Sequence, residues 1–320
     1  MRRHAYRSAF ANDINDFINY KAGLGIKGKS REWYLLKFDE YCAKNNLAAF
    51  DKKTVEGWVL DHEENHPCKH RSWMSYIRDF GRYLRLTGKE DAYVLSESFK
   101  AKPIRPTPYL FSEAEVGAFL NAAATLHVFS PWAWQAKCFF GLMYALGLRT
   151  CEAIRLGLRD VSIDGRYIDI VWSKGNRSRR LYLTGEVAAM LDECNLKTCA
   201  YIGSKRETFF VNAVGRPVSS CSVGVCFSRI WKNAGLARPL EGKRPRPYDF
   251  RHHFAYRNIE RWSAAGVDVN AMIPYLARCM GHSSFDSTYY YIHTSPGFLS
   301  SYAKIACKSA DILPEVGFDG

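Results

Sequence analysis

The chain has 320 residues, and its 45 Lys and Arg residues outnumber its 32 Asp and Glu residues, which gives a net charge of +13. With 47% hydrophobic and 24% charged residues, this composition excludes an intrinsically disordered protein, and the length favours two domains that each bury a core. No stretch approaches 18 apolar residues and residues 1–10 lack an apolar run, so we expect neither membrane insertion nor secretion, and a cytoplasmic protein. The positive charge predicts a polyanionic partner, of which nucleic acid is the commonest.

The first hundred residues have the spacing of helices. Apolar residues recur three and four apart in the segments SREWYLLKFDEYCAKNN, TVEGWVLDHEEN and HRSWMSYIRDFGRYLRL. We therefore predict an N-terminal helical bundle over residues 1–100.

The last of these segments has two distinct faces. Its apolar face carries Trp73, Ile77, Phe80 and Leu84. Its opposite face carries Arg71, Arg78, Arg82 and Arg85. Such a stripe is typical either of a solvated surface or of a surface that neutralises DNA phosphates. Together with the motifs described below, it leads us to predict that these arginines bind the DNA backbone.

A linker follows the bundle. The segment SFKAKPIRPTPYLF, residues 98–111, contains three prolines and little periodicity, so we place the linker at residues 101–111. Ser112 and Glu115 then form an S-x-x-E capping box, with Phe111 and Val116 positioned as its hydrophobic staple. A second domain is therefore predicted over residues 112–320.

The second domain combines helices with one hairpin. The apolar stretch WAWQAKCFFGLMYALGLRTCEAIRLGL predicts a helix, a turn and another helix. Residues 167–171 (YIDIV) and 179–183 (RRLYL), separated by WSKGNRS, predict an antiparallel β-hairpin with a basic turn. Further helical spacing is present in TGEVAAMLDEC, SVGVCFSRIWKNAG, DFRHHFAYRNIERW and NAMIPYLARCMG. The predicted fold class is mainly α (α+β), with a small antiparallel sheet in a mostly helical second domain.

Segments of the second domain carry a family resemblance. In chain order they are GLRTCEAIRL, SKGNRSRRLYL, YDFRHHFA and MGHSSFDSTYYYIH. Their order and spacing resemble the catalytic boxes of the tyrosine recombinases, the family that includes phage integrases and chromosome-dimer resolvases. The resemblance covers residues 101–320, and the N-terminal bundle looks like the core-binding domain of that family. One box alone would be weak evidence, whereas the full set in the right order is specific.

The resemblance implies an enzyme, a site-specific DNA recombinase or integrase that cleaves and rejoins double-stranded DNA through a 3′-phosphotyrosyl intermediate. It implies action as a homo-tetramer on DNA or as a hetero-assembly with related recombinases, without a metal or cofactor. The segment ERWSAAGVDVNAMIPYLARCMGH is also similar to segments of recombinases from mobile elements.

The resemblance assigns site residues by their positions in the boxes. The catalytic residues that it implies are Arg149, Lys174, Arg251, His282 and Tyr291. In the same order they match the first arginine, the hairpin lysine, the second arginine, the third-box histidine and the nucleophile. Tyr291 is preferred over its neighbours Tyr289 and Tyr290 because the family's nucleophile stands nine residues after the third-box histidine.

The chemistry of a phosphodiester accounts for these residue types. Guanidinium groups are planar and permanently charged, so Arg149 and Arg251 can hold a phosphate bidentately, and lysine should not substitute for either. A free phenol has a pKa of about 10, and forming phenolate at pH 7 costs roughly 4 kcal/mol, so Tyr291 needs help from the arginines or from a base. The leaving sugar hydroxyl needs a proton donor, and Lys174 on the hairpin can reach it.

One position departs from the family pattern. The residue three before the second arginine is usually histidine, and here it is Tyr248. A phenol can donate a hydrogen bond to a phosphate oxygen but is a poor base near neutral pH. We therefore predict a phosphate-orienting role for Tyr248. The general base stays open, with His282 the nearer candidate, and His252 and His253 are expected to be packing residues.

Other functions are compatible with this sequence. A type IB topoisomerase uses similar chemistry but would relax supercoiled DNA of any sequence without metal. A catalytically decayed accessory protein would bind DNA without cleaving it, and Tyr248 would be the first sign of that decay. Structural roles are also open to single residues, since Arg149 could pair with Glu152 or Asp160 and His282 could be a core histidine.

Overall fold

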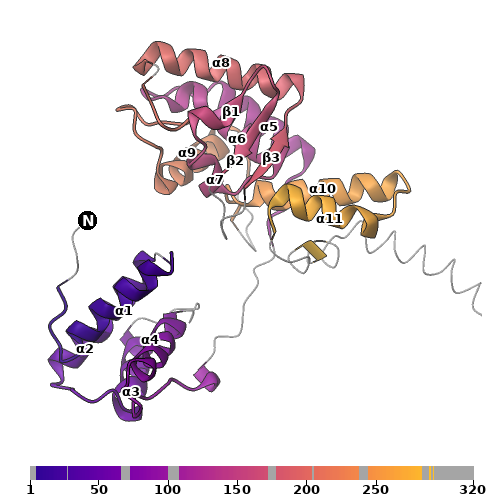
Figure 1. Cartoon of the computed structure of the whole chain (residues 1–320). Helices are drawn as coiled ribbons and strands as arrows, with labels where there is room; N and C mark the ends of the chain where they lie inside the picture. The colour runs from indigo at the N-terminus through magenta and orange to yellow at the C-terminus, as the bar shows by residue number, and fades with distance from the viewer. Residues whose placement is uncertain are drawn as a thin grey trace, which may run out of the picture. The chain divides into compact units, whose positions relative to one another are not determined.

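The computed structural model describes residues 5–26, 28–65, 73–99, 108–171, 178–203, 205–237 and 244–282, together with residues 288, 289 and 291. The chain divides into two compact units, residues 1–106 and residues 107–320 (Figure 1). Each unit has its own hydrophobic core. Among the described residues, none of the helices combines the length and the apolar character that crossing a bilayer requires.

The N-terminal unit is a bundle of helices. Its described elements are α1 (Ala11–Gly23), α2 (Lys29–Lys44), α3 (Lys52–Asn65), α4 (Met74–Leu86) and the 3-10 turn η2 (Glu97–Phe99). Their apolar faces enclose an aromatic core in which Phe38, Trp73 and Phe80 are almost fully buried. Trp58 of α3 packs edge-on against Trp73, with ring centroids 5.0 Å apart. Edge-to-face contacts of this kind are favoured by the ring quadrupoles and hold the helices in register.

The arginine face of α4 differs from the prediction at Arg78. This residue is buried, with 5% of its surface exposed. Its Nε donates to the carbonyl oxygen of Leu95 at 2.8 Å, and its Nη2 donates to that of Ser96 at 2.9 Å. The segment after α4 therefore folds back over this side of the helix, and the expectation that Arg78 faces solvent was wrong.

Other members of the predicted stripe do reach the surface. Arg82 is exposed, and its Nη2 lies 3.2 Å from Oε1 of Glu97. Arg85 is exposed as well, and its Nε donates to the carbonyl oxygen of Ala92 at 2.7 Å. Arg71 lies outside the described residues. Arg82 and Arg85 are thus the described members of the stripe that a phosphate could approach.

The C-terminal unit combines helices with a small antiparallel sheet. Its helical elements are α5 (Glu113–Ala124), α6 (Trp132–Leu146), α7 (Thr150–Ile154), η3 (Leu158–Asp160), α8 (Gly185–Ile202), α9 (Ser220–Asn233), α10 (Asp249–Ala264) and α11 (Val269–Met280). Its strands are β1 (Val161–Ser162), β2 (Tyr167–Ile170) and β3 (Arg179–Tyr182), paired in the order β1-β2-β3. The predicted hairpin is the β2–β3 pair, in which Ile168 lies opposite Leu181. The predicted fold class is confirmed.

Helix α6 is the centre of the larger core of this unit, where it packs against α5, α8 and α10. Phe140 of α6 is fully buried and packs edge-on against Phe119 of α5 at 5.3 Å.

The predicted capping box is present at the start of α5. The Ser112 hydroxyl accepts from the Glu115 amide at 3.2 Å, and the Glu115 carboxylate accepts from the Ser112 amide at 2.8 Å. These contacts fix α6, whose end begins the candidate site.

Helices α10 and α11 lie side by side and form a smaller core (Figure 1). Its buried members are Ala255, Tyr256, Ile259, Val269, Ile273, Leu276, Met280 and Tyr291. The start of α10 contacts the end of α11, because Arg251 binds the carbonyl oxygen of Met280. The segments YDFRHHFA and MGHSSFDSTYYYIH therefore meet at one corner of the C-terminal unit.

Candidate active site

The site begins where α6 ends. Gly147 caps this helix with a left-handed backbone at a φ of +62°, and a Cβ atom there would lie 2.5 Å from the ring of Phe254. Glycine meets both demands because it has no Cβ. The chain therefore turns sharply after α6, and Arg149 stands at the N-terminus of α7.

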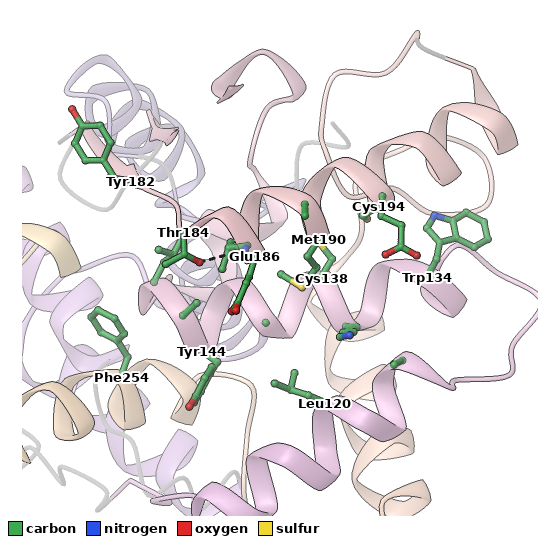
Figure 2. A pocket seen from close by; sticks show the side chains of 18 of the residues that line it. Leu120, Trp134, Cys138, Tyr144, Tyr182, Thr184, Glu186, Met190, Cys194 and Phe254 are labelled. Carbon is green, nitrogen blue, oxygen red and sulfur yellow. Dashed lines mark hydrogen bonds between the residues drawn. The ribbon is translucent and has the colours of Figure 1, made fainter. Parts of the chain in front are cut away.

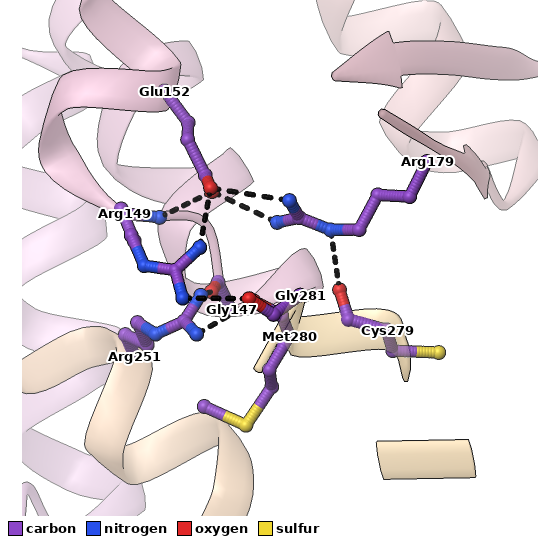
Figure 3. Close-up of polar contacts among 8 residues, drawn as sticks. All are labelled: Gly147, Arg149, Glu152, Arg179, Arg251, Cys279, Met280 and Gly281. Carbon is purple, nitrogen blue, oxygen red and sulfur yellow. Dashed lines mark hydrogen bonds and ion pairs between the residues drawn. The ribbon is translucent and has the colours of Figure 1, made fainter. Parts of the chain in front are cut away.

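Arg149 joins segments that are far apart in the sequence. Its Nη1 donates to Oε1 of Glu152 at 2.7 Å, and its Nη2 donates to the carbonyl oxygen of Gly281 at 2.8 Å (Figure 3). The ion pair with Glu152 is the structural role considered for this arginine from the sequence. The hydrogen bond to Gly281 goes beyond that role, because it brings the segment GLRTCEAIRL against the segment MGHSSFDSTYYYIH.

Arg251 is the most deeply buried charge of the site, with 0% of its surface exposed. Its Nη1 donates to the carbonyl oxygen of Gly147 at 2.7 Å and its Nη2 to that of Met280 at 2.6 Å (Figure 3). Its buried Nε has no hydrogen-bond partner among the described residues. Burial, and then the positive charge of Arg149, lower the pKa of the Arg251 guanidinium to about 10. Two cations therefore lie close together in a place that favours an anion.

A third arginine, Arg179 on β3, was missed by the sequence analysis. Its Nη1 and Nη2 donate to the two oxygens of the Glu152 carboxylate at 3.1 and 2.8 Å, and its Nε donates to the carbonyl oxygen of Cys279 at 2.7 Å (Figure 3). A Cβ atom at Gly281, where φ is +64°, would lie 2.8 Å from Nη1 of Arg179. Arg179 thus clamps the hairpin to both α7 and the end of α11.

The Glu152 carboxylate binds both Arg149 and Arg179 and is buried, with only 2% of the residue's surface exposed. Burial alone would raise the pKa of this carboxyl, but the bonds from Arg179 and Arg149 outweigh burial and lower the pKa to about 2. The carboxylate is therefore ionised at any physiological pH. The alternation along β3 was the available signal for Arg179, since the neighbouring Arg180 points outward and pairs with Asp169 at 2.8 Å.

His282 follows Gly281 at the same corner. Its Nδ1 lies 2.6 Å from the hydroxyl oxygen of Thr288. Burial, and then the charges of Arg251 and Arg149, lower the pKa of the His282 imidazole to about 3. His282 is therefore neutral at pH 7.

Tyr291 is almost fully buried, with 3% of its surface exposed, and its hydroxyl lies 3.0 Å from Nδ1 of His252. The ring of His282 is nearly parallel to the phenol ring, with centroids 6.2 Å apart, and the ring of Tyr256 packs edge-on at 5.5 Å. His252, which was expected to be a packing residue, thus contacts the hydroxyl of the predicted nucleophile. Its position next to Arg251 was the only signal for His252 that the sequence contained.

The remaining predicted site residues divide into two groups. Tyr248 is 38% exposed, and its ring packs edge-on against that of His252 at 5.1 Å, so it belongs to the same cluster. Lys174 lies outside the described residues. Of the two tyrosines that were not chosen as the nucleophile, Tyr290 also lies outside the described residues. Tyr289 is 38% exposed.

The phage integrase family matches residues 110–297, which is more than half of the chain. The chain belongs to this family. The family resemblance inferred from the sequence boxes is therefore confirmed.

Relatives of this integrase-family chain include y4rB of Sinorhizobium fredii, a protein named provisionally as an integrase/recombinase. It is 25% identical over 297 residues, which cover 90% of this chain and 94% of that protein. Tyrosine recombinase XerD of Bifidobacterium longum is 27% identical over 258 residues, covering 78% of this chain and 79% of that protein. The structure of the XerH site-specific recombinase bound to its palindromic difH substrate in a post-cleavage complex superposes with a TM-score of 0.64 at 18% identity. That match covers 95% of this chain and 91% of XerH and shows a shared fold.

The integrase-family unit also has a cavity of about 930 Å³, lined mainly by α6, α8 and α10 (Figure 2). Met190 and Cys138 contribute apolar surface, and Tyr144 and Glu186 contribute polar atoms. None of the predicted catalytic residues that the structure describes lines this cavity.

Among the described residues, no group of three or more His, Cys, Asp and Glu side chains is close enough to hold a metal ion.

Proposed function

We propose that this chain is a site-specific DNA recombinase that cleaves and rejoins duplex DNA through a 3′-phosphotyrosyl bond to Tyr291. The observation that carries this proposal is that Arg149 and Arg251 meet Tyr291 at one corner of the C-terminal unit. We call Tyr291 and the rings packed against it, those of His252, Tyr256 and His282, the Tyr291 cluster. Arg149 bonds to Gly281, Arg251 bonds to Met280, and Tyr291 packs on His252, the residue after Arg251. Membership of the phage integrase family supports the same activity.

The charge of the corner supports a phosphate as the substrate group. Arg251 is buried beside Arg149, and the pKa of Arg251 is lowered first by the cost of burying its charge and then by the neighbouring positive charge of Arg149. A phosphodiester anion would remove that repulsion and accept charged hydrogen bonds from both guanidiniums, each worth roughly 1.5 to 3 kcal/mol. The same groups would stabilise the extra charge on the non-bridging oxygens during displacement.

The proposed reaction exchanges one phosphodiester for another. The phenol oxygen of Tyr291 forms a bond to phosphorus while the bond from phosphorus to the 5′-oxygen breaks, and Lys174 donates a proton to that oxygen. Attack by a second 5′-hydroxyl on the phosphotyrosine reverses the step. Because a phosphate ester bond is conserved throughout, rejoining needs no external source of energy.

The proposed assembly follows from the number of nucleophiles. Each chain supplies one Tyr291, and complete exchange between two duplexes requires four strand breaks. A homo-tetramer on DNA, or a hetero-assembly with related recombinases, provides four such phenols. The N-terminal unit is proposed to be the core-binding domain, with Arg82 and Arg85 contacting the DNA backbone.

The test uses a duplex that the full-length wild-type chain selects from a randomised library, prepared with a nick near the cleavage site so that the leaving strand diffuses away. The wild-type chain should form a covalent adduct that survives denaturing electrophoresis. Tyr291→Phe should bind the duplex with unchanged affinity and form no adduct, whereas the matched control Tyr289→Phe should still form it. If Tyr291→Phe still formed an adduct, Tyr291 would not be the nucleophile.

The same assay separates the alternatives. Binding by the wild-type chain with no adduct on any selected duplex would indicate a decayed accessory protein. Metal-free relaxation of a supercoiled plasmid that lacks the selected sequence would indicate a topoisomerase.

A further inference from the structure

The contact between Tyr291 and His252 has a chemical consequence. Nδ1 of His252 lies 3.0 Å from the Tyr291 hydroxyl, and the two rings are tilted by 56° with centroids 5.5 Å apart. This distance is that of a hydrogen bond, and the interplanar angle shows that the two rings are not stacked face to face. A proton can therefore pass between these two atoms without any rearrangement of the side chains.

His282 is less well suited to the same task. Its Nδ1 is in contact with the hydroxyl oxygen of Thr288 at 2.6 Å. Its ring lies nearly parallel to that of Tyr291, at an interplanar angle of 13° and a centroid distance of 6.2 Å. His282 therefore offers the phenol a ring face, and it is left to bind the phosphate or to shape the site.

Tyr248 is also poorly suited to accept the phenolic proton of Tyr291. Its ring packs edge-on against the His252 imidazole, at 74° and 5.1 Å, and so holds the imidazole from the side. A phenol is a poor proton acceptor near neutral pH. Tyr248 thus supports the orientation of His252.

The protonation of His252 fits that of an acceptor. Burial is the main cause that lowers the pKa of the His252 imidazole to about 4; the Asp249 carboxylate opposes this shift, and the positive charges of Arg246 and Arg251 add to it. The ring is therefore neutral at pH 7. An anionic phosphate held by Arg251 would cancel part of that positive field and raise the proton affinity of His252 when the substrate is bound.

We propose that His252 is a catalytic residue whose Nδ1 accepts the phenolic proton as the Tyr291 oxygen attacks phosphorus. This role rests on the proposed strand-cleavage function. In the step, the bond from the phenol oxygen to phosphorus forms and the bond from phosphorus to the 5′-oxygen breaks. The phenolic proton moves to Nδ1, Nε2 keeps its own proton, and Lys174 protonates the departing 5′-oxygen. The imidazolium so formed returns its proton to Tyr291 when a 5′-hydroxyl rejoins the strand.

The first measurement is the rate of adduct formation on the nicked, selected duplex. His252→Asn can still accept a hydrogen bond but cannot take up a proton at neutral pH, so adduct formation should be at least 100-fold slower with unchanged DNA affinity. The matched control is His253→Asn. His253 is adjacent and buried, and its contacts among the described residues are with Tyr144, Phe111 and Glu113 rather than with Tyr291, so its variant should cleave at the wild-type rate. Equal rates for His252→Asn and the wild-type chain would overturn the proposal.

A second measurement separates proton transfer from packing. Replacing Tyr291 by a fluorinated tyrosine makes the phenol more acidic and lessens its need for a base. The deficit of His252→Asn should then shrink at least tenfold relative to the same comparison with ordinary tyrosine. A deficit of unchanged size would show that His252 only packs the site. If His252→Asn does not unfold cooperatively like the wild-type chain, His252→Gln takes its place in both measurements.

The outcomes distinguish the two levels of inference. No adduct from the wild-type chain would overturn the proposed function and the role of His252 with it. A wild-type adduct together with either contrary result above would overturn the role of His252 alone.

Discussion

Each unit of the molecule contains a buried arginine that donates to backbone carbonyls. Arg78 in the N-terminal unit binds Leu95 and Ser96, and Arg251 in the C-terminal unit binds Gly147 and Met280. Their surroundings differ in charge. The Nε of Arg78 lies 3.7 Å from a Glu97 carboxylate oxygen, whereas the described residues place no hydrogen-bonded carboxylate on Arg251.

This difference separates an arginine whose charge is paired within its own unit from one that has no hydrogen-bonded carboxylate among the described residues. Burying a cation is costly unless an opposite charge and hydrogen bonds compensate for it, and Arg78 has both within its own unit. In the C-terminal unit, the Glu152 carboxylate already binds Arg149 and Arg179. Arg251 adds a third positive charge beside the two that share the Glu152 carboxylate, so these groups carry an excess of positive charge.

The largest expected effect is that of exchanging arginine for lysine in the two places. Arg251→Lys keeps the charge but loses the planar fork that holds a phosphate, so adduct formation should fall about 100- to 1,000-fold, or roughly 3 to 4 kcal/mol. Arg78→Lys should leave the rate within about twofold at saturating DNA. It should instead lower the free energy of unfolding of the N-terminal unit by roughly 1 to 3 kcal/mol.

The rates come from single-turnover cleavage of the nicked duplex, and the stabilities come from hydrogen exchange in the full chain. Similar losses of cleavage in both variants would remove the distinction between the two arginines.

Much of this architecture follows from local sequence signals. The Ser112 cap, the β2–β3 hairpin and the turn at Gly147 each depend on residues close together in the chain, and for that reason they could be read in advance. The order of the sequence boxes was sufficient for the family because several weak matches had to occur together. Lys174 stays a prediction.

The errors and omissions share one physical cause, which is contact between distant segments. Helical periodicity places Arg78 on the polar face of α4, but it cannot show that residues 95 and 96 cover that face. Position next to Arg251 gives no indication that His252 meets Tyr291, 39 residues later in the chain. Alternation along β3 distinguishes Arg179 from Arg180, but it cannot identify the partners of Arg179, since Glu152 and Cys279 lie on two other elements.

A smaller effect is expected from Glu152→Gln. The folded pKa of Glu152 is lowered from 4.5 to about 2, so its contribution to stability is fully present above about pH 4.5 and is lost as pH falls toward 2. At pH 7 the variant should be less stable than the wild-type chain by up to about 3 kcal/mol in the C-terminal unit. Adduct formation should slow roughly tenfold, because Arg149 loses an anchor.

The check is the difference in unfolding free energy between the wild-type chain and the variant, followed from pH 7 to pH 3. Taking the difference cancels the titration of groups that the two proteins share. If the difference in unfolding free energy were constant across this range, the arginine contacts would not lower the pKa of Glu152.

The smallest effects are expected on the salt dependence of DNA binding. They come from replacing the exposed arginines of α4, Arg82 and Arg85, and are compared with the effect of replacing the buried Arg78. Each phosphate contact adds about one to the slope of log affinity against log salt concentration, so Arg82→Ala and Arg85→Ala should each reduce the slope by about one. The ion pair of Arg82 with Glu97 is exposed and weak, and a phosphate can replace it at little cost. Arg78→Ala should leave the slope unchanged, since a guanidinium already bound to the carbonyls of the chain releases no counterions from DNA. Fluorescence anisotropy with the selected duplex over a range of KCl concentrations measures all three slopes. A reduction with Arg78→Ala alone would mean that the N-terminal unit opens on DNA, and the contrast between the two buried arginines would then hold only for the free chain.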